Sequence, residues 1–414
     1  MSTILDVLNE DCWHYILDWL HTDDIIRSER VSKEWRDVIY RYLQGVGISI
    51  EYDTRPELWY GQNHNLSHSY RILRIEGDNP EVLKNLVRKW GSCIKKSDCL
   101  DSTMDVLTKN CPNLKDVTFH GVQSDNLATA SSKVFKKLKR VHFKGCNDLT
   151  DKCVRQWLAS YNLEELVIWE ADDVTGRFLI SEHSEKLKHL SFKDCKTLDY
   201  CHLFSAVTHL KKLNKLELIL ANKEVYLNVH KLLDQLPDLE DLCMRWEKME
   251  LRYEWAAAVG RLRLRRLDLS FNPNVNDELL EKASCGFGRL EELLLMRCEG
   301  ITGAGVRTAC SAAGAALRGL QLGSNTQLEN EYVVDIVRAC PNLVWIDLSF
   351  CHGITNYIVG EVANARTARA KKLQLIAECT YVDEVEEGMF PWLEVEFGDN
   401  YLSKNYSYPC NTKK

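Results

Sequence analysis

The most regular feature of the sequence is a six-residue pattern with leucine first, a hydrophobic residue fourth and another sixth. Ten copies follow one another at intervals of 24 to 27 residues. They begin at Leu114, Leu138, Leu163, Leu187, Leu213, Leu239, Leu264, Leu290, Leu317 and Leu343. The alternation predicts a short strand in each copy, because every second side chain of a strand points to the same side. A turn and a helical stretch follow, as at 151–160 and 276–284.

This repetition predicts an α/β solenoid. One such unit cannot bury its own apolar face, whereas stacked units share a continuous core and place their strands on one curved face. A weaker copy lies near Leu373. The pattern is less regular at 216–225 and 242–251, where we expect irregular loops.

Residues 5–43 do not follow the repeat and predict three short helices. The first presents apolar residues at positions i, i+3, i+4 and i+7, the spacing of one helical face. These residues are Trp13, Ile16, Leu17 and Leu20. The second begins at Thr22, and the third follows Ser32 with Trp35, Val38, Ile39 and Tyr42 at the same spacing. A module this small buries little by itself, so exposed apolar faces on it indicate a docking surface.

The intervening residues 44–110 are the least regular part of the chain. GISIEY and YRILRIEG predict strands and NPEVLKNLVRKW predicts a helix, which is consistent with irregular first repeats.

We therefore divide the chain into a helical module at 1–43, a linker or first repeats at 44–110, a solenoid at 111–388 and a C-terminal cap or tail at 389–414. Seven acidic residues between Glu378 and Glu396, with no Lys or Arg, suit a polar cap.

Charge and composition narrow the functional classes. The 414 residues include 53 Lys and Arg against 60 Asp and Glu, a net charge of −7, which argues against bulk nucleic-acid binding. No apolar run reaches the length of about 18 residues that a membrane span needs. The N-terminal MSTILDVLNEDCWH lacks the features of a secretory signal, so we expect cytoplasmic or nuclear residence, or both. The 16 cysteines are then expected to be reduced, buried packing residues rather than disulfides or zinc ligands.

The repeats resemble leucine-rich repeats, and several resemble the cysteine-containing variety. The segments that carry this resemblance are 143–154, 192–199, 296–306 and 349–359. In them Cys146, Cys195, Cys298 and Cys351 stand where other varieties have Asn, and the resemblance implies a structural role for them.

The N-terminal module resembles an F-box. Leu8, Asp11, Ile16, Leu17 and Leu20 match the first part of that pattern. Asp24 and Ile25 match the middle, and Val31, Ser32, Lys33 and Trp35 match the end. Asn9 replaces the usual Pro, and Asp11 the usual Glu. The alternative is a three-helix cap of the solenoid without a partner.

An F-box followed by leucine-rich repeats is the arrangement of the F-box/leucine-rich-repeat family. The resemblance implies a non-enzymatic substrate receptor of SCF ubiquitin ligases that promotes ubiquitination and proteasomal degradation of its targets. The F-box would bind a Skp-type adaptor and, through it, cullin and RING subunits, and no cofactor or metal is implied. Carried over by position, the adaptor contacts are Leu8, Ile16, Leu20, Ile25, Val31 and Trp35.

The target would bind the strand face of the repeats, where aromatic and charged residues are candidate anchors. We favour Arg140, His142, Lys144, Trp169 and Lys193, followed by Arg245 and Trp345. The basic run at 133–144 fits an acidic or phosphorylated target segment, although a merely solvated face is the simpler reading of each residue alone.

Two other classes stay open. A scaffold would recruit partners without driving ubiquitination, and an enzyme would need a catalytic constellation. The sequence contains no P-loop, dinucleotide-binding, nucleophile-elbow or HExxH motif, so the enzyme ranks last.

Overall fold

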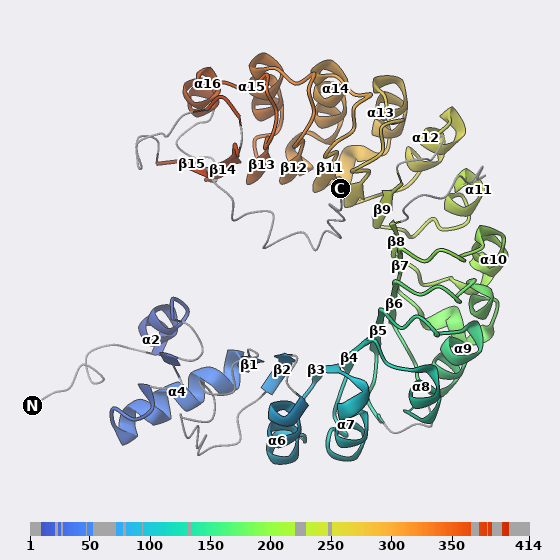
Figure 1. Cartoon of the computed structure of the whole chain (residues 1–414). Coiled ribbons are helices and arrows are strands. Elements are labelled where there is room, and N and C mark those ends of the chain that lie inside the picture. The colour runs from blue at the N-terminus through green and yellow to red at the C-terminus, as the bar shows by residue number, and fades with distance from the viewer. Residues whose placement is uncertain are drawn as a thin grey trace, which may run out of the picture. The chain divides into compact units, whose positions relative to one another are not determined.

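The computed structural model describes residues 10–20, 24–25, 28–46, 48–52, 72–77, 80–92, 94–130, 135–219, 229–246, 251–365, 372–378, 380–382 and 391–396. The chain divides into two compact units at residues 184 and 185, which we call unit 1 and unit 2. In each unit parallel strands lie side by side in chain order, and helices cover one side of them (Figure 1).

Unit 1 contains the helical module and the first repeats. Its helices are α2 (Glu10–Leu17), α4 (Lys33–Val46), α6 (Pro80–Trp90), α7 (Met104–Asn110), α8 (Ser124–Ala130) and α9 (Asp151–Ser160). Its strands are β1 (Ile48–Tyr52), β2 (Ile72–Gly77), β3 (Lys96–Cys99), β4 (Asp116–His120), β5 (Arg140–Lys144) and β6 (Glu165–Trp169). Each strand pairs in parallel with the next. The two strands and the helix predicted within 44–110 are therefore confirmed, and they extend the same parallel series.

Unit 2 continues the repeat. Its strands are β7 (His189–Lys193), β8 (Lys215–Ile219), β9 (Asp241–Arg245), β10 (Arg266–Asp268), β11 (Glu292–Leu294), β12 (Gly319–Gln321), β13 (Trp345–Asp347), β14 (Leu373–Ile376) and β15 (Leu393–Glu396). Its helices are α10 (Tyr200–Ala206), α11 (Val229–Leu233), α12 (Tyr253–Val259), α13 (Asp277–Ser284), α14 (Gly303–Ala313), α15 (Asn330–Ala339) and α16 (Tyr357–Ala365). Much of the two segments expected to form irregular loops, and of the predicted C-terminal tail, lies outside the described residues.

The repeated leucines form the core. All ten predicted anchors are at most 3% exposed, so the six-residue pattern correctly marks the inward-facing positions. A leucine-rich-repeat solenoid is thus confirmed, because parallel strands follow one another in chain order and the repeated leucines are buried.

Eight of the strands, β4 to β7 and β10 to β13, are followed by a turn that directs one side chain into the core. The turn residue has a positive φ, between 52° and 65°, at eight positions. They are Gly121, Gly145, Glu170, Asp194, Phe271, Arg297, Ser324 and Phe350. The residue after each of them is at most 3% exposed, and four of these residues are Cys146, Cys195, Cys298 and Cys351. Their thiols contact main-chain carbonyls, such as that of Leu269 at 3.2 Å from Cys298 Sγ. The predicted structural role of these cysteines is confirmed.

No helix among the described residues is long and apolar enough to cross a membrane. The described residues also contain no group of three or more His, Cys, Asp or Glu side chains placed to hold a metal ion.

Candidate protein-interaction surfaces

A pair of tryptophans holds the helical module together. Trp13 of α2 meets Trp35 of α4 edge to face, with ring centroids 4.9 Å apart. Trp35 Nε1 donates a hydrogen bond of 3.0 Å to Ser28 Oγ, which in turn donates to the carbonyl of Ile25 at 2.8 Å. The segment between the helices is therefore tied to α4 through the indole of Trp35.

The start and middle of α4 are also fixed by side chains. Ser32 Oγ accepts a hydrogen bond of 3.0 Å from the amide of Trp35, the bond that an N-cap serine makes. Tyr42 donates a 2.7 Å hydrogen bond to Asp18 across the module. Burial, together with this carboxylate, raises the pKa of Tyr42 to about 12. The predicted third helix, with Ile39 and Tyr42 buried, is confirmed.

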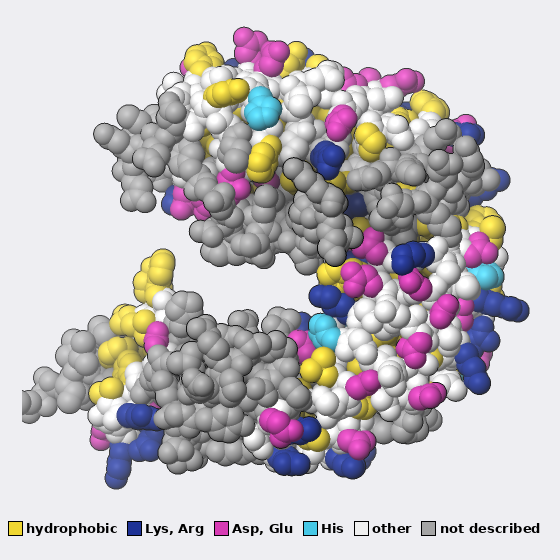
Figure 2. Space-filling model, viewed as in Figure 1, with side chains coloured by type: hydrophobic (Ala, Val, Ile, Leu, Met, Phe, Trp, Pro, Cys, Tyr) yellow, Lys and Arg dark blue, Asp and Glu magenta, His cyan; other side chains and the backbone are white. Residues whose placement is uncertain are grey.

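Apolar side chains remain exposed on α2, directly after it and shortly before α4. We call Tyr15, Ile16, Trp19, Leu20 and Val31 the module patch, and they are between 39% and 77% exposed. They make up half of the ten exposed large hydrophobic residues of the described chain, within 17 consecutive positions. Figure 2 shows hydrophobic side chains gathered over α2. Such a concentration marks a protein-interaction surface.

The predicted adaptor contacts divide between this surface and the interior. Ile16, Leu20 and Val31 belong to the module patch, whereas Ile25 is 2% exposed and packs inside the module. Trp35 is half-buried and its indole joins the internal contacts above. Leu8 lies outside the described residues. The adaptor roles themselves stay predictions.

Sequence reasoning missed Tyr15 and Trp19, which are 67% and 77% exposed. Both lie off the predicted apolar face of the first helix, where a solvated helix would carry polar residues. The aromatic side chains at these two positions were the signal in the sequence that could have identified them as exposed contact residues. The predicted face itself splits, since Trp13 and Leu17 point inward while Ile16 and Leu20 stay exposed.

The second surface is the strand face of unit 1, where the predicted target contacts meet neighbouring strands. Arg140 forms a bidentate pair with Asp116 on β4, at 2.6 and 2.7 Å. This carboxylate raises the pKa of Arg140. His142 Nε2 lies 2.7 Å from Glu165 Oε1, and Lys144 Nζ lies 4.1 Å from the ring centroid of Trp169. Four of the five favoured residues therefore form one row of side chains across β5 and β6.

The basic run at 133–144 does not form a single surface. Lys136 and Lys137 are exposed in the turn before β5, and Lys139 pairs with Glu164 at 3.0 Å. Arg140 and Lys144 belong instead to the strand face, with the partners given above. Lys133 lies outside the described residues.

The strand face of unit 2 carries buried ion pairs. Glu217 is 9% exposed and lies 3.3 Å from Lys193 and 2.9 Å from Lys215. Burial alone would raise the pKa of Glu217, but His189, whose Nε2 lies 3.7 Å from the carboxylate, and the charges of Lys193 and Lys215 outweigh burial and lower it. Lys193, the fifth favoured target contact, is thus part of an internal ion-pair cluster.

A similar cluster surrounds Asp268, which is fully buried. Burial works against its charge, yet Arg245 and Arg266 lower its pKa. Arg245 Nη2 is 2.6 Å from the Asp268 carboxylate, and Arg266 Nη2 is 3.4 Å from it. Trp345, the other secondary candidate, packs at the position of Gly319, where a Cβ would lie 2.4 Å from the indole.

One comparison with known proteins matches the helical module, and another matches nearly the whole chain. Residues 5–42 match the F-box domain. The whole chain resembles a yeast protein in the solved structure described as the crystal structure of the Rad7 and Elc1 complex, with a TM-score of 0.60 and 17% sequence identity. The alignment covers 95% of this chain and 98% of that one, so the two share a fold along nearly their full length. No curated protein matches the sequence.

Proposed function

We propose, from the F-box domain at residues 5–42 and the leucine-rich repeats that follow it, that the chain is a substrate receptor of an SCF-type ubiquitin ligase. Its F-box would bind a Skp-type adaptor and, through it, cullin and RING subunits. The repeats would hold a protein target for ubiquitination and degradation. The observation that carries the proposal is the exposed module patch on a segment that matches the F-box.

The receptor itself would perform no chemistry. Holding adaptor and target on one chain raises the effective concentration of target lysines near the ubiquitin-charged enzyme. The similar yeast chain comes from a structure described as a complex of Rad7 and Elc1, and this supports the proposal that a chain of this fold binds a partner protein. The row from Arg140 to Trp169 is the proposed target surface, because its charged and aromatic side chains are the types that dominate interfaces.

A pair of matched variants tests the adaptor half. Ile16→Asp with Leu20→Asp places two charges in the module patch at side chains that are 39% and 44% exposed. We expect adaptor and cullin to be lost from the purified complex, because an unpaired charge in an apolar interface is strongly unfavourable. Phe204→Asp with Tyr253→Asp, at side chains 45% and 52% exposed in unit 2, should retain both partners.

Deletion of residues 1–43 gives the decisive comparison. Quantitative mass spectrometry of the purified chain should find neither adaptor nor cullin after this deletion. Cullin that stays bound would contradict the F-box assignment. Adaptor without cullin on the intact chain would favour the alternative, a scaffold that is not coupled to ubiquitination.

A further inference from the structure

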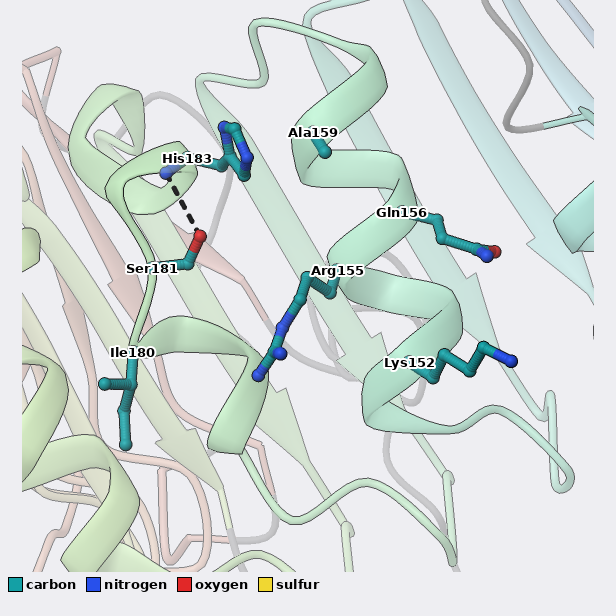
Figure 3. Close-up of a pocket in the computed structure, with 7 residues that line it drawn as sticks. All are labelled: Lys152, Arg155, Gln156, Ala159, Ile180, Ser181 and His183. Atoms are coloured by element: carbon teal, nitrogen blue, oxygen red, sulfur yellow. Dashed lines mark hydrogen bonds between the residues drawn. The ribbon is translucent and has the colours of Figure 1, made fainter.

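A hollow of about 330 Å³ opens on the helix side of unit 1, between α9 and residues 180–183 (Figure 3). Neither the module patch nor the strand face contributes to it. Its lining consists of Lys152, Arg155, Gln156, Ala159, Ile180, Ser181 and His183. The hollow thus combines cationic side chains with an aliphatic part formed by Ala159 and by Ile180, which is 39% exposed.

The residues that line this hollow include two cationic side chains and no carboxylate. Lys152 and Arg155 are exposed on α9, and Arg177 is exposed on the adjoining loop. Among the described residues, no carboxylate forms an ion pair with any of the three. Arg155 Nη2 donates a hydrogen bond of 3.3 Å to the carbonyl of Arg177, and Figure 3 shows the Arg155 side chain extending toward the segment that carries Ile180.

The carboxylate next to Lys152 in sequence has other partners. Asp151 Oδ2 accepts hydrogen bonds from the amide and the hydroxyl of Thr175, at 3.1 and 2.6 Å. Asp151 Oδ1 accepts from the amides of Gly176 and Phe178, at 3.0 and 3.3 Å. Four donors of the loop therefore hold the Asp151 carboxylate at the loop, and it is not among the residues that line the hollow.

We infer that this hollow binds an acidic peptide segment of a partner protein. Carboxylates of the segment would face Lys152 and Arg155, while one aliphatic side chain would pack against Ile180 and Ala159. Charge complementarity carries the assignment, because the lining contains Lys152 and Arg155 and no carboxylate on a chain whose net charge is −7. The inference is independent of the proposed function, since it uses a different surface of the repeats.

The test measures fluorescence anisotropy of the labelled acidic peptide EEDLEED with the full chain, and the neutral peptide QQNLQQN serves as the control ligand. We expect saturable binding of the acidic peptide that weakens as salt is added, because salt screens exposed charges. Lys152→Glu with Arg155→Glu should weaken binding at least about tenfold. Ile180→Ser should weaken it several-fold, because the aliphatic contact is lost.

Lys136→Glu with Lys137→Glu is the matched variant, since it reverses two exposed charges of the same unit outside the hollow. It should change the affinity less than about twofold. Absence of saturable binding, equal binding of the neutral peptide, or equal losses in the two double variants would each overturn the inference. Circular dichroism checks folding, and Lys152→Gln with Arg155→Gln gives the same comparison if the charge reversal unfolds the chain.

Discussion

At the residue scale, the turns that follow eight of the strands depend on a backbone conformation that most side chains disfavour. Eight such turns have a residue with positive φ, yet only Gly121 and Gly145 among them are glycines. The other six carry side chains, including Phe271 and Arg297, at a cost on the order of 1 kcal/mol each. The repeat tolerates this because the turn buries the following side chain.

Gly145→Ala isolates this backbone effect. A Cβ at Gly145 would meet only Glu170 Oε2, at 3.8 Å, so the substitution creates no clash, but φ is +62°. We expect a loss of about 1 kcal/mol in the free energy of unfolding, measured by urea denaturation. Gly288→Ala is the matched control, because its Cβ has no atom within 4 Å and its φ is not positive. It should be neutral or stabilising by a few tenths of a kcal/mol. Equal effects of the two substitutions would contradict the explanation.

Residue-scale details were the hardest to predict from sequence. Periodicity identifies the inward leucines because burial requires them in every repeat. It does not assign Ile25 to the interior or Trp19 to the surface, because three short helices can pack in more than one way around Trp13 and Trp35. The sequence analysis also missed the ion pairs between side chains of neighbouring strands. The repeat period could have indicated them, because Asp116 and Arg140 are 24 positions apart and lie opposite each other on β4 and β5.

At the element scale, the sequence predicted the strands and helices well, because each repeat supplies the same local signals. The helices of adjacent repeats are further linked by side chains that the pattern did not single out. Asp277, in the first turn of α13, accepts hydrogen bonds from the amide and the hydroxyl of Thr302, at 2.8 and 2.7 Å. Thr302 is itself the N-cap of α14. Asp151 makes the corresponding bonds to Thr175 in unit 1.

Asp277→Ala tests whether this link stabilises the stacking of repeats. Two donors of Thr302 lose their acceptor in a partly buried position, so we expect a loss of about 1–3 kcal/mol in the free energy of unfolding. Glu278→Ala removes an exposed negative charge from the same helical turn and should cost only a few tenths of a kcal/mol. If urea denaturation gives equal losses, the helix dipole rather than the link explains the effect.

At the scale of the whole molecule, carboxylates outnumber basic side chains, and some of them are buried within ion-pair clusters. Glu217 and Asp268 are the clearest cases, since each is at most 9% exposed and lies between two basic side chains. In both, the folded state lowers the pKa, so the unfolded chain takes up the proton first as pH falls. Stability from these carboxylates is therefore complete above their ordinary pKa values and is lost below them.

Glu217→Gln should remove part of this acid dependence. At neutral pH the variant leaves Lys193 and Lys215 without their shared carboxylate, and we expect it to be less stable than the wild type by roughly 3 kcal/mol. As pH falls below about 4.5, the ordinary value for glutamate, protonation of Glu217 destabilises the wild type alone, so the difference in the free energy of unfolding should shrink. Glu278→Gln, at an exposed position, should follow the wild type at every pH. A difference between Glu217→Gln and the wild type that stays constant between pH 7 and pH 3, measured by urea denaturation, would show that the carboxylate charge of Glu217 does not stabilise the sheet.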